Sequence, residues 1–107
     1  MKRKENLSKW TFLTNHAHVL LCLAKSPDMR MRDLASEIGI TERAVQRIVA
    51  ELAEEGYIDI ERDGRCNTYT THGEKHMKHP IAAHRLVEDL LKLINERSSL
   101  HTTEEND

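Results

Sequence analysis

Aromatic residues are scarce in this chain of 107 residues, where Phe, Trp and Tyr together make up 4%. A chain of this length buries one modest core, and with so few aromatic side chains a lone monomer would be thinly packed. We therefore expect a single domain with a partner surface. The two cysteines, Cys22 and Cys66, form no CxxC pair, and a reducing compartment is the simplest interpretation.

Long apolar runs are absent as well. No stretch approaches the roughly 20 apolar residues that a membrane-spanning helix needs. The first ten residues, MKRKENLSKW, are basic but lack the apolar centre of a signal peptide. The sequence therefore predicts a cytoplasmic protein with no membrane partner.

Catalytic motifs are also missing. The four glycines form no phosphate-binding loop, and the sequence contains no HExxH motif. No Ser, His and Asp set stands on a fold large enough to form a cleft. We expect a protein that is not an enzyme and that has no cofactor.

An excess of positive charge, common in proteins that bind nucleic acids, is lacking. Sixteen Lys and Arg stand against eighteen Asp and Glu, which gives a net charge of −2. The acids Glu51, Glu54, Glu55 and Asp59 follow one another late in the central part of the chain. Binding to DNA would then depend on a few well-placed contacts and not on bulk electrostatics.

Residues 32–51, RDLASEIGITERAVQRIVAE, carry the pattern of a helix-turn-helix. Gly39 stands where a residue with positive φ would end a short first helix, and Thr41 can cap the next helix through its hydroxyl. The small Ala35 suits the crossing of the two helices, with Ile40 beside Val45 at the corner. The apolar stripes consist of Leu34, Ala35 and Ile38 on the first helix and Ala44, Val45, Ile48, Val49 and Leu52 on the second.

Polar side chains are left facing outward near the start of the second helix. In a helix that lies in the major groove of DNA, this face would meet base edges and phosphates. The alternative is a plain helical hairpin with a solvated polar face. The outward residues are Thr41, Glu42, Arg43, Gln46, Arg47 and Ala50.

A β-hairpin is predicted directly after these helices. Gly56 closes the second helix, and Asp63-Gly64 is a typical two-residue hairpin loop. This loop would pair Ile58 with Tyr69, Ile60 with Asn67 and Arg62 with Arg65. A hairpin in this position is the wing of a winged helix. Its residues Arg62, Arg65 and Asn67 are candidates for contacts with phosphates or a minor groove.

The segment before the helix-turn-helix supplies a further helix. Residues 10–24 contain an aromatic lead-in and then a helix capped at Thr14 or Asn15, which Ser26-Pro27 ends. Residues 29–31 are expected to form a short extended piece that pairs with the wing. This completes a three-helix core.

Near the C-terminus, Pro80 is expected to open a helix from about Ile81 to Arg97. Its apolar face is broad enough for two neighbours, which favours pairing with a second copy of the chain; the alternative is a helix folded back on its own core. The domain would span residues 10–97, between a basic flexible tail (1–9) and a disordered acidic tail (98–107). The predicted dimer interface is Trp10, Phe12, Leu86, Val87, Leu90, Leu91 and Ile94.

Together these features resemble small winged helix-turn-helix regulators related to the MarR and ArsR families. The resemblance covers about residues 10–95 and includes the 34–48 apolar pattern, the Asp63-Gly64 hairpin and the flanking helices. It implies a mainly α fold with a small hairpin that binds operator DNA as a homodimer. The chain departs from full-length MarR proteins in being shorter, with one helix after the wing.

Seven histidines are unusual for this length, and four of them, His72, His76, His79 and His84, lie between the wing and the last helix. An i,i+4 spacing places two ligands on one helical face, but Gly73 and Pro80 make a helix here doubtful. Hydrogen-bonding or exposed histidines are therefore favoured over a metal site.

The sequence thus predicts a homodimeric transcriptional regulator that binds double-stranded DNA, with a palindromic operator as partner. Two alternatives remain open. One is a winged-helix module that binds a protein, and the other is a metal-responsive repressor of the ArsR type. A small-molecule effector is not indicated by any residue.

Overall fold

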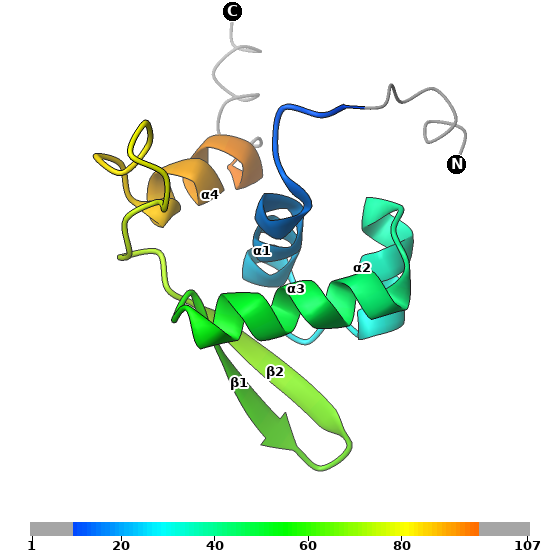
Figure 1. Ribbon diagram of the computed structural model, residues 1–107. Coiled ribbons are helices and arrows are strands. Elements are labelled where there is room, and N and C mark those ends of the chain that lie inside the picture. Colours follow the sequence, from blue (N-terminus) through cyan, green and yellow to red (C-terminus); the bar gives the residue numbers. More distant parts are fainter. Residues whose placement is uncertain (1–9, 97–107) are drawn as a thin grey trace, which may run out of the picture.

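The computed structural model describes residues 10–96, so the tails predicted at 1–9 and 98–107 lie outside the described residues. Within this part, Figure 1 shows α3 crossing the molecule, with α1 and α2 packed above it and a hairpin projecting below. The mainly α winged helix-turn-helix is confirmed. Its elements are α1 (Asn15–Lys25), α2 (Met31–Ile38), α3 (Glu42–Glu54), β1 (Ile58–Asp63), β2 (Cys66–Thr71) and α4 (Val87–Asn95).

Caps define both ends of α1. The hydroxyl of Thr14 accepts a hydrogen bond from the amide of Ala17 at 3.1 Å, which satisfies one of the free donors of the first turn. At the other end, the amide of Ser26 donates to the carbonyl of Cys22 at 2.8 Å. The helix stops there because Pro27 has no amide to continue the ladder.

The turn between α2 and α3 has the geometry that the sequence predicts. Gly39 has a φ of +87°, which only glycine adopts without strain, and its amide donates to the carbonyl of Ala35 at 2.8 Å. Thr41 then caps α3, accepting from the amide of Ala44 at 3.1 Å. These local bonds fix where α3 begins.

One core joins the three helices to the hairpin and α4. Leu23 of α1, Leu34 of α2 and Ile48 of α3 are almost fully buried, and the small Ala35 of α2 belongs to the same core. Truncating one of these large side chains to Ala would cost about 2–5 kcal/mol of folding free energy. Ile58, Tyr69 and Val87 extend this core beneath the hairpin and α4.

The register of the wing differs from the prediction. Asp63 pairs with Cys66, so the loop is Gly64-Arg65 and not Asp63-Gly64. Gly64 has a φ of +69° and stands first in the loop, the place where a type II′ turn requires glycine. Each residue of β1 pairs with a residue of β2 two positions further along than predicted, and a shift by an even number keeps Ile58, Ile60 and Tyr69 on one face of the hairpin. Ile60 is nevertheless 45% exposed, because it lies beyond the helices.

The predicted pairing of residues 29–31 with the wing is also wrong in detail. Met31 is the first residue of α2, and the backbone hydrogen bond to the wing is made by Pro27, two residues before Met29. There the amide of Tyr69 donates to the carbonyl of Pro27 at 2.9 Å. Pro27 has no amide to return the bond, so a regular ladder does not form.

The last helix is shorter than predicted. It begins at Val87 and not at Ile81, because the segment before it pairs with the chain that leaves the wing. The amide of Met77 donates to the carbonyl of Arg85 at 3.0 Å, and the amide of Val87 donates to the carbonyl of Lys75 at 2.8 Å. Backbone groups used across this ribbon are not available for helical bonds to residues four positions away.

Candidate nucleic-acid interface

The polar face predicted for α3 is exposed in the structure. The residues that bury this helix, Val45, Ile48, Val49 and Leu52, recur at helical spacing and point toward α1 and α2. The opposite side is consequently free of contacts with the core. All six predicted residues, Thr41, Glu42, Arg43, Gln46, Arg47 and Ala50, are solvent-exposed.

The wing presents its candidates differently. Arg65 lies in the loop at the tip, while Arg62 lies on β1 opposite Asn67, and both arginines are exposed. Asn67 is half-buried, and its side-chain amide donates to the hydroxyl of Tyr69 at 3.4 Å. Within residues 10–96 the side chains of Arg62 and Arg65 make no hydrogen bond or ion pair, whereas the side chain of Asn67 bonds within its own strand.

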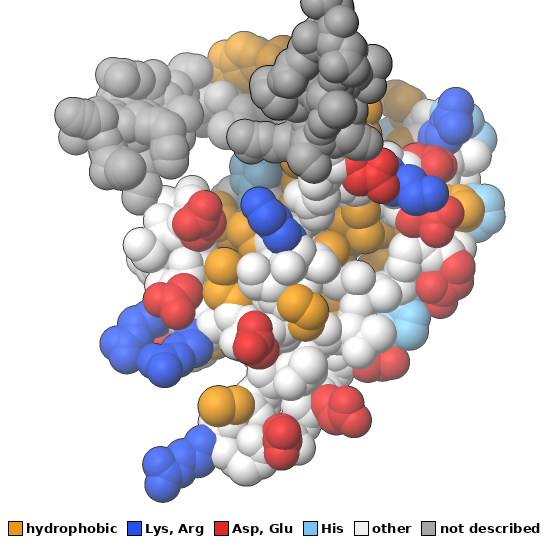
Figure 2. All heavy atoms as spheres, turned by 180° about the vertical axis from the view of Figure 1, so that it is seen from behind, with side chains coloured by type: hydrophobic (Ala, Val, Ile, Leu, Met, Phe, Trp, Pro, Cys, Tyr) orange, Lys and Arg blue, Asp and Glu red, His pale blue; other side chains and the backbone are white. Residues whose placement is uncertain are grey.

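Charge is distributed unevenly over the surface. Figure 2, seen from behind, shows Lys and Arg side chains on the side of α2 and at the hairpin tip with Asp and Glu side chains beside them, and further Lys and Arg among the many Asp and Glu side chains on the opposite side. At the start of α3 the exposed Glu42 stands next to the exposed Arg43, so the charge of this face is also mixed.

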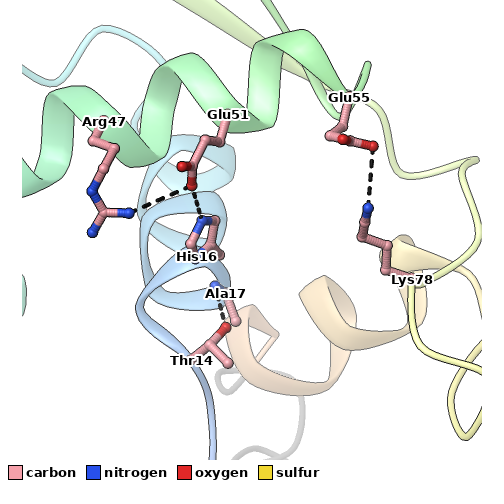
Figure 3. A network of polar contacts seen from close by, with 7 residues as sticks. All are labelled: Thr14, His16, Ala17, Arg47, Glu51, Glu55 and Lys78. Atoms are coloured by element: carbon pink, nitrogen blue, oxygen red, sulfur yellow. Dashed lines mark hydrogen bonds and ion pairs between the residues drawn. The ribbon is translucent and has the colours of Figure 1, made fainter.

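Arg47 belongs to a polar network that reaches across to α1 (Figure 3). Its Nη1 lies 3.6 Å from Oε1 of Glu51, one helical turn along α3. The same oxygen accepts a hydrogen bond from Nε2 of His16 at 2.7 Å. The His16 hydrogen bond and the Arg47 charge hold the pKa of the Glu51 carboxyl below its ordinary value, so this carboxylate stays ionised at neutral pH.

Two basic residues were not among the predicted contacts. Arg30 precedes the first turn of α2 and Arg32 lies in it, and both side chains are exposed. In a helix-turn-helix the first helix of the pair crosses the DNA backbone, which makes its N-terminal end a natural place for phosphate contacts. The signal in the sequence was the pair of arginines at the predicted start of this helix.

The residues of the predicted dimer surface divide into three groups by burial. Val87 is 4% exposed and Leu91 packs against the same core, so the prediction that they face a partner is wrong for Val87 and weakened for Leu91. Leu86 and Leu90 are half-buried. Trp10 and Phe12 are 65% and 91% exposed, with their rings edge to face at 5.1 Å, and Ile94 is 44% exposed.

Three of the four clustered histidines bond to other parts of the protein. Nδ1 of His76 donates to the carbonyl of Ala83 at 2.9 Å, and Nδ1 of His79 accepts from the amide of Ile81 at 3.1 Å. His72 lies between two carboxylates, as discussed below. Within residues 10–96, no group of three or more His, Cys, Asp or Glu is placed to hold a metal ion.

A cavity of about 620 Å³ opens between α1, α3, the segment after the wing and α4. Its wall is mainly apolar and includes Leu20, Leu52, Tyr57 and Leu90. His16, Glu51, Glu55 and Lys78 also line it, and Nζ of Lys78 lies 3.2 Å from Oε1 of Glu55 (Figure 3). No motif in the sequence indicates this cavity, because its walls come from four separate segments.

Several solved structures share this fold. Lactococcus lactis ZitR in complex with DNA is 17% identical over 92% of this chain and 62% of its own, with a TM-score of 0.57. Streptococcus pneumoniae FabT in complex with DNA is also 17% identical, with the same coverage of 92% and 62% and a TM-score of 0.51. MepR, a regulator of a Staphylococcus aureus multidrug efflux pump, is 14% identical over 96% of this chain and 69% of its own, with a TM-score of 0.52.

At these identities the likeness shows the fold alone, and this chain spans 62% of the length of ZitR and of FabT. Comparison with curated proteins finds no match. None of the helices in the described residues is long and apolar enough to cross a membrane. The MarR family itself matches residues 11–65, from the aromatic lead-in to the tip of the wing. The chain therefore belongs to the MarR family, whose members are transcription regulators and not enzymes.

Proposed function

We propose that this protein binds double-stranded DNA sequence-specifically as a homodimer, with α3 in the major groove and the wing at the flanking backbone or minor groove. The observation that carries the proposal is the exposed face of α3, where Arg43, Gln46 and Arg47 stand together without contacts to the core. These are the side-chain types that read guanine and adenine edges. The complexes of ZitR and FabT with DNA support the same use of this fold.

The residues divide into two roles in this proposal. Gln46 and Arg47 contact base edges, because they lie on the middle of the face that enters the groove. Arg62 and Arg65 of the wing and Arg30 and Arg32 of α2 contact phosphates and set the orientation of the protein. The remaining residues of the proposed face are Thr41, Glu42 and Arg43, with Asn67 at the edge of the wing.

A homodimer is proposed from the apolar side chains that the core leaves uncovered. Trp10 and Phe12 precede α1, and Leu93 and Ile94 lie near the end of α4, which packs against α1 where the side-chain amide of Asn95 donates to the carbonyl of Leu21 at 3.2 Å. Large apolar side chains left exposed in this way are typical of a surface that a partner covers. A twofold-symmetric dimer would bind a palindromic operator with one recognition helix in each half-site.

Selection of bound sequences from a random DNA pool tests this proposal. We expect a palindromic winning site, and we expect Gln46→Ala or Arg47→Ala to weaken binding to it by about 1–3 kcal/mol and to flatten base preference. Arg65→Ala should instead weaken all sequences alike and reduce the slope of log affinity against log salt by about one.

Unchanged binding by all these variants would show that α3 and the wing do not contact DNA. Failure to select any sequence would favour a protein-binding module.

A metal-responsive repressor is tested separately. We expect chelation to leave thermal stability and DNA affinity unchanged, since bound metal would add its binding energy to folding. Stoichiometric zinc in untagged protein would contradict this.

A further inference from the structure

Arg47 differs from the other arginines proposed to meet DNA. Within the described residues, Arg43, Arg62 and Arg65 form no ion pair, whereas Arg47 has a carboxylate partner, Glu51. The two side chains are four positions apart on α3, so they lie on one side of the helix, with 3.6 Å between Nη1 and Oε1. Arg47 therefore has a preferred direction that the other arginines lack.

An exposed pair of this kind holds a side chain only weakly when both partners are free to move. Here Glu51 is held from a second helix, because His16 Nε2 lies 2.7 Å from the same carboxylate oxygen. His16 is the second residue of α1, directly after the capped first residue, and its position is fixed by that helix. The carboxylate is thus tied to α1 as well as to α3, through a His16 side chain that is itself 43% exposed.

The direction of this contact matters for base recognition. Figure 3 shows Arg47 and Glu51 both pointing from α3 toward the start of α1, where His16 meets them. Arginine recognises guanine through two parallel hydrogen bonds, which require the guanidinium to approach in one orientation. A guanidinium without this restraint reaches phosphates in many conformations, and phosphate contacts carry no sequence information.

We propose that Glu51 is a positioning residue that orients Arg47 for base recognition, and that His16 holds Glu51 in place. This inference rests on the proposed function, since it assigns the cause of sequence preference within the same DNA-binding face. It also predicts that one acidic residue of α3 favours specificity although it repels the DNA backbone.

The test is Glu51→Gln, measured against the selected site and a scrambled site of equal length. We expect tighter binding to scrambled DNA, because a negative charge is lost and Arg47 is free to reach phosphates. The ratio of the two affinities should fall about five- to tenfold, the lower part of the range for one good base contact. Glu51→Asp, whose shorter side chain cannot span both partners, should lower the ratio as well.

Glu55→Gln is the matched control. It removes the same charge one turn further along, where the partner is Lys78 at 3.2 Å and no proposed DNA contact is involved. We expect this variant to tighten binding to both DNAs alike and to leave the ratio unchanged. Circular dichroism of each variant checks that the fold is retained.

Double variants separate positioning from a general electrostatic effect. In an Arg47→Ala background, Glu51→Gln should cause no further loss of the affinity ratio, because the side chain that it orients is absent. His16→Ala should lower the ratio, and His16→Gln, whose amide nitrogen stands close to the place of Nε2, should restore most of it.

The outcomes distinguish this inference from the proposed function. If Arg47→Ala lowers the ratio but Glu51→Gln does not, Glu51 does not orient Arg47 and the inference fails while DNA binding stands. If Glu55→Gln lowers the ratio as much as Glu51→Gln, the effect is one of charge alone and the inference fails again. If the wild-type protein selects no DNA sequence, the proposed function and this inference fall together.

Discussion

Thr41 connects the geometry of the turn to the start of α3. Its hydroxyl accepts the amide of Ala44 at 3.1 Å, and the bond satisfies a donor that would otherwise face solvent at the start of α3. Because Thr41 also belongs to the proposed DNA face, substituting it affects both stability and binding. The effect on stability follows from the capping bond alone.

We expect Thr41→Ala to lower the free energy of unfolding by about 1 kcal/mol, the usual effect of losing an N-cap. Thr41→Ser keeps the hydroxyl and should stay close to the wild type. Urea unfolding followed by circular dichroism measures both variants. Equal losses in the two would mean that packing of the threonine methyl group, and not the cap, is responsible.

Gly73 lies where the chain leaving the wing passes close to α4. A Cβ at this position would lie 2.7 Å from Cβ of Glu88, a distance that real side chains do not adopt. The amide of Glu88 donates to the carbonyl of Gly73 at 2.9 Å, which explains the close approach of the two backbones.

Gly73→Ala should therefore displace α4 and lower the free energy of unfolding by about 1–3 kcal/mol, as overpacking does. NMR amide chemical shifts that change along α4 and not along α2 would show that the structural change is at α4. A variant with wild-type stability and unchanged shifts in α4 would show that the two segments are further apart in solution.

At the scale of elements, His72 joins the base of the wing to the segment that leads to α4. Its Nε2 lies 2.8 Å from Oδ2 of Asp59 on β1, and its Nδ1 lies 3.1 Å from Oε2 of Glu74. A carboxylate oxygen accepts and does not donate, so both bonds form together only when the ring carries both protons. The hydrogen bond with Asp59, assisted by the two negative charges, raises the pKa of His72 above its ordinary value of 6.5.

This shift gives the stability a pH dependence of definite sign. A histidine whose pKa is raised on folding stabilises the fold fully at pH values below its pKa in the unfolded chain. This contribution is lost as the pH rises through its pKa in the folded protein. We expect the urea concentration that unfolds half of the wild-type protein to fall as the pH rises from 6.5 through the pKa of His72 in the folded protein. The fall should be smaller in His72→Gln. An NMR titration of the His72 ring would contradict the prediction if its pKa were at or below 6.5.

At the scale of the whole molecule, the proposed dimer depends on apolar side chains that the core leaves exposed. Leu93 is 75% exposed on α4, and Phe12 is 91% exposed before α1. A long final helix with a broad apolar face for a partner, as the sequence predicts, is wrong. The helix α4 spans nine residues, and its Val87 is buried in the core of the same chain. The partner surface is therefore expected at the end of α4 and the aromatic lead-in.

Leu93→Glu should convert the proposed dimer into a folded monomer, because a charge buried in the interface would have no partner. Ile81→Glu serves as control, since Ile81 is 78% exposed in the segment before α4 and outside the proposed surface. Light scattering at tens of micromolar measures the mass of each variant. A wild-type protein that is monomeric at this concentration, or a dimer lost equally in both variants, would contradict the proposed surface.

The amino-acid sequence by itself determined the helix-turn-helix. The capping hydroxyl of Thr41 and the positive φ of Gly39 act over a few residues, so their effects follow from spacing alone. The exposed face of α3 follows from the same local rule, because the apolar stripe of a helix leaves the opposite side free. For this reason the six candidate residues of α3 are exposed, as the sequence predicts.

Only the tertiary structure decided how separate segments meet. The start of α4 at Val87 depends on bonds to Lys75, and the hairpin register depends on which residue occupies the first loop position; neither is fixed by helical or strand periodicity. The contact between His16 and Glu51 joins positions 35 residues apart. Such pairs follow from packing of the whole chain, and local propensity contains no information about them.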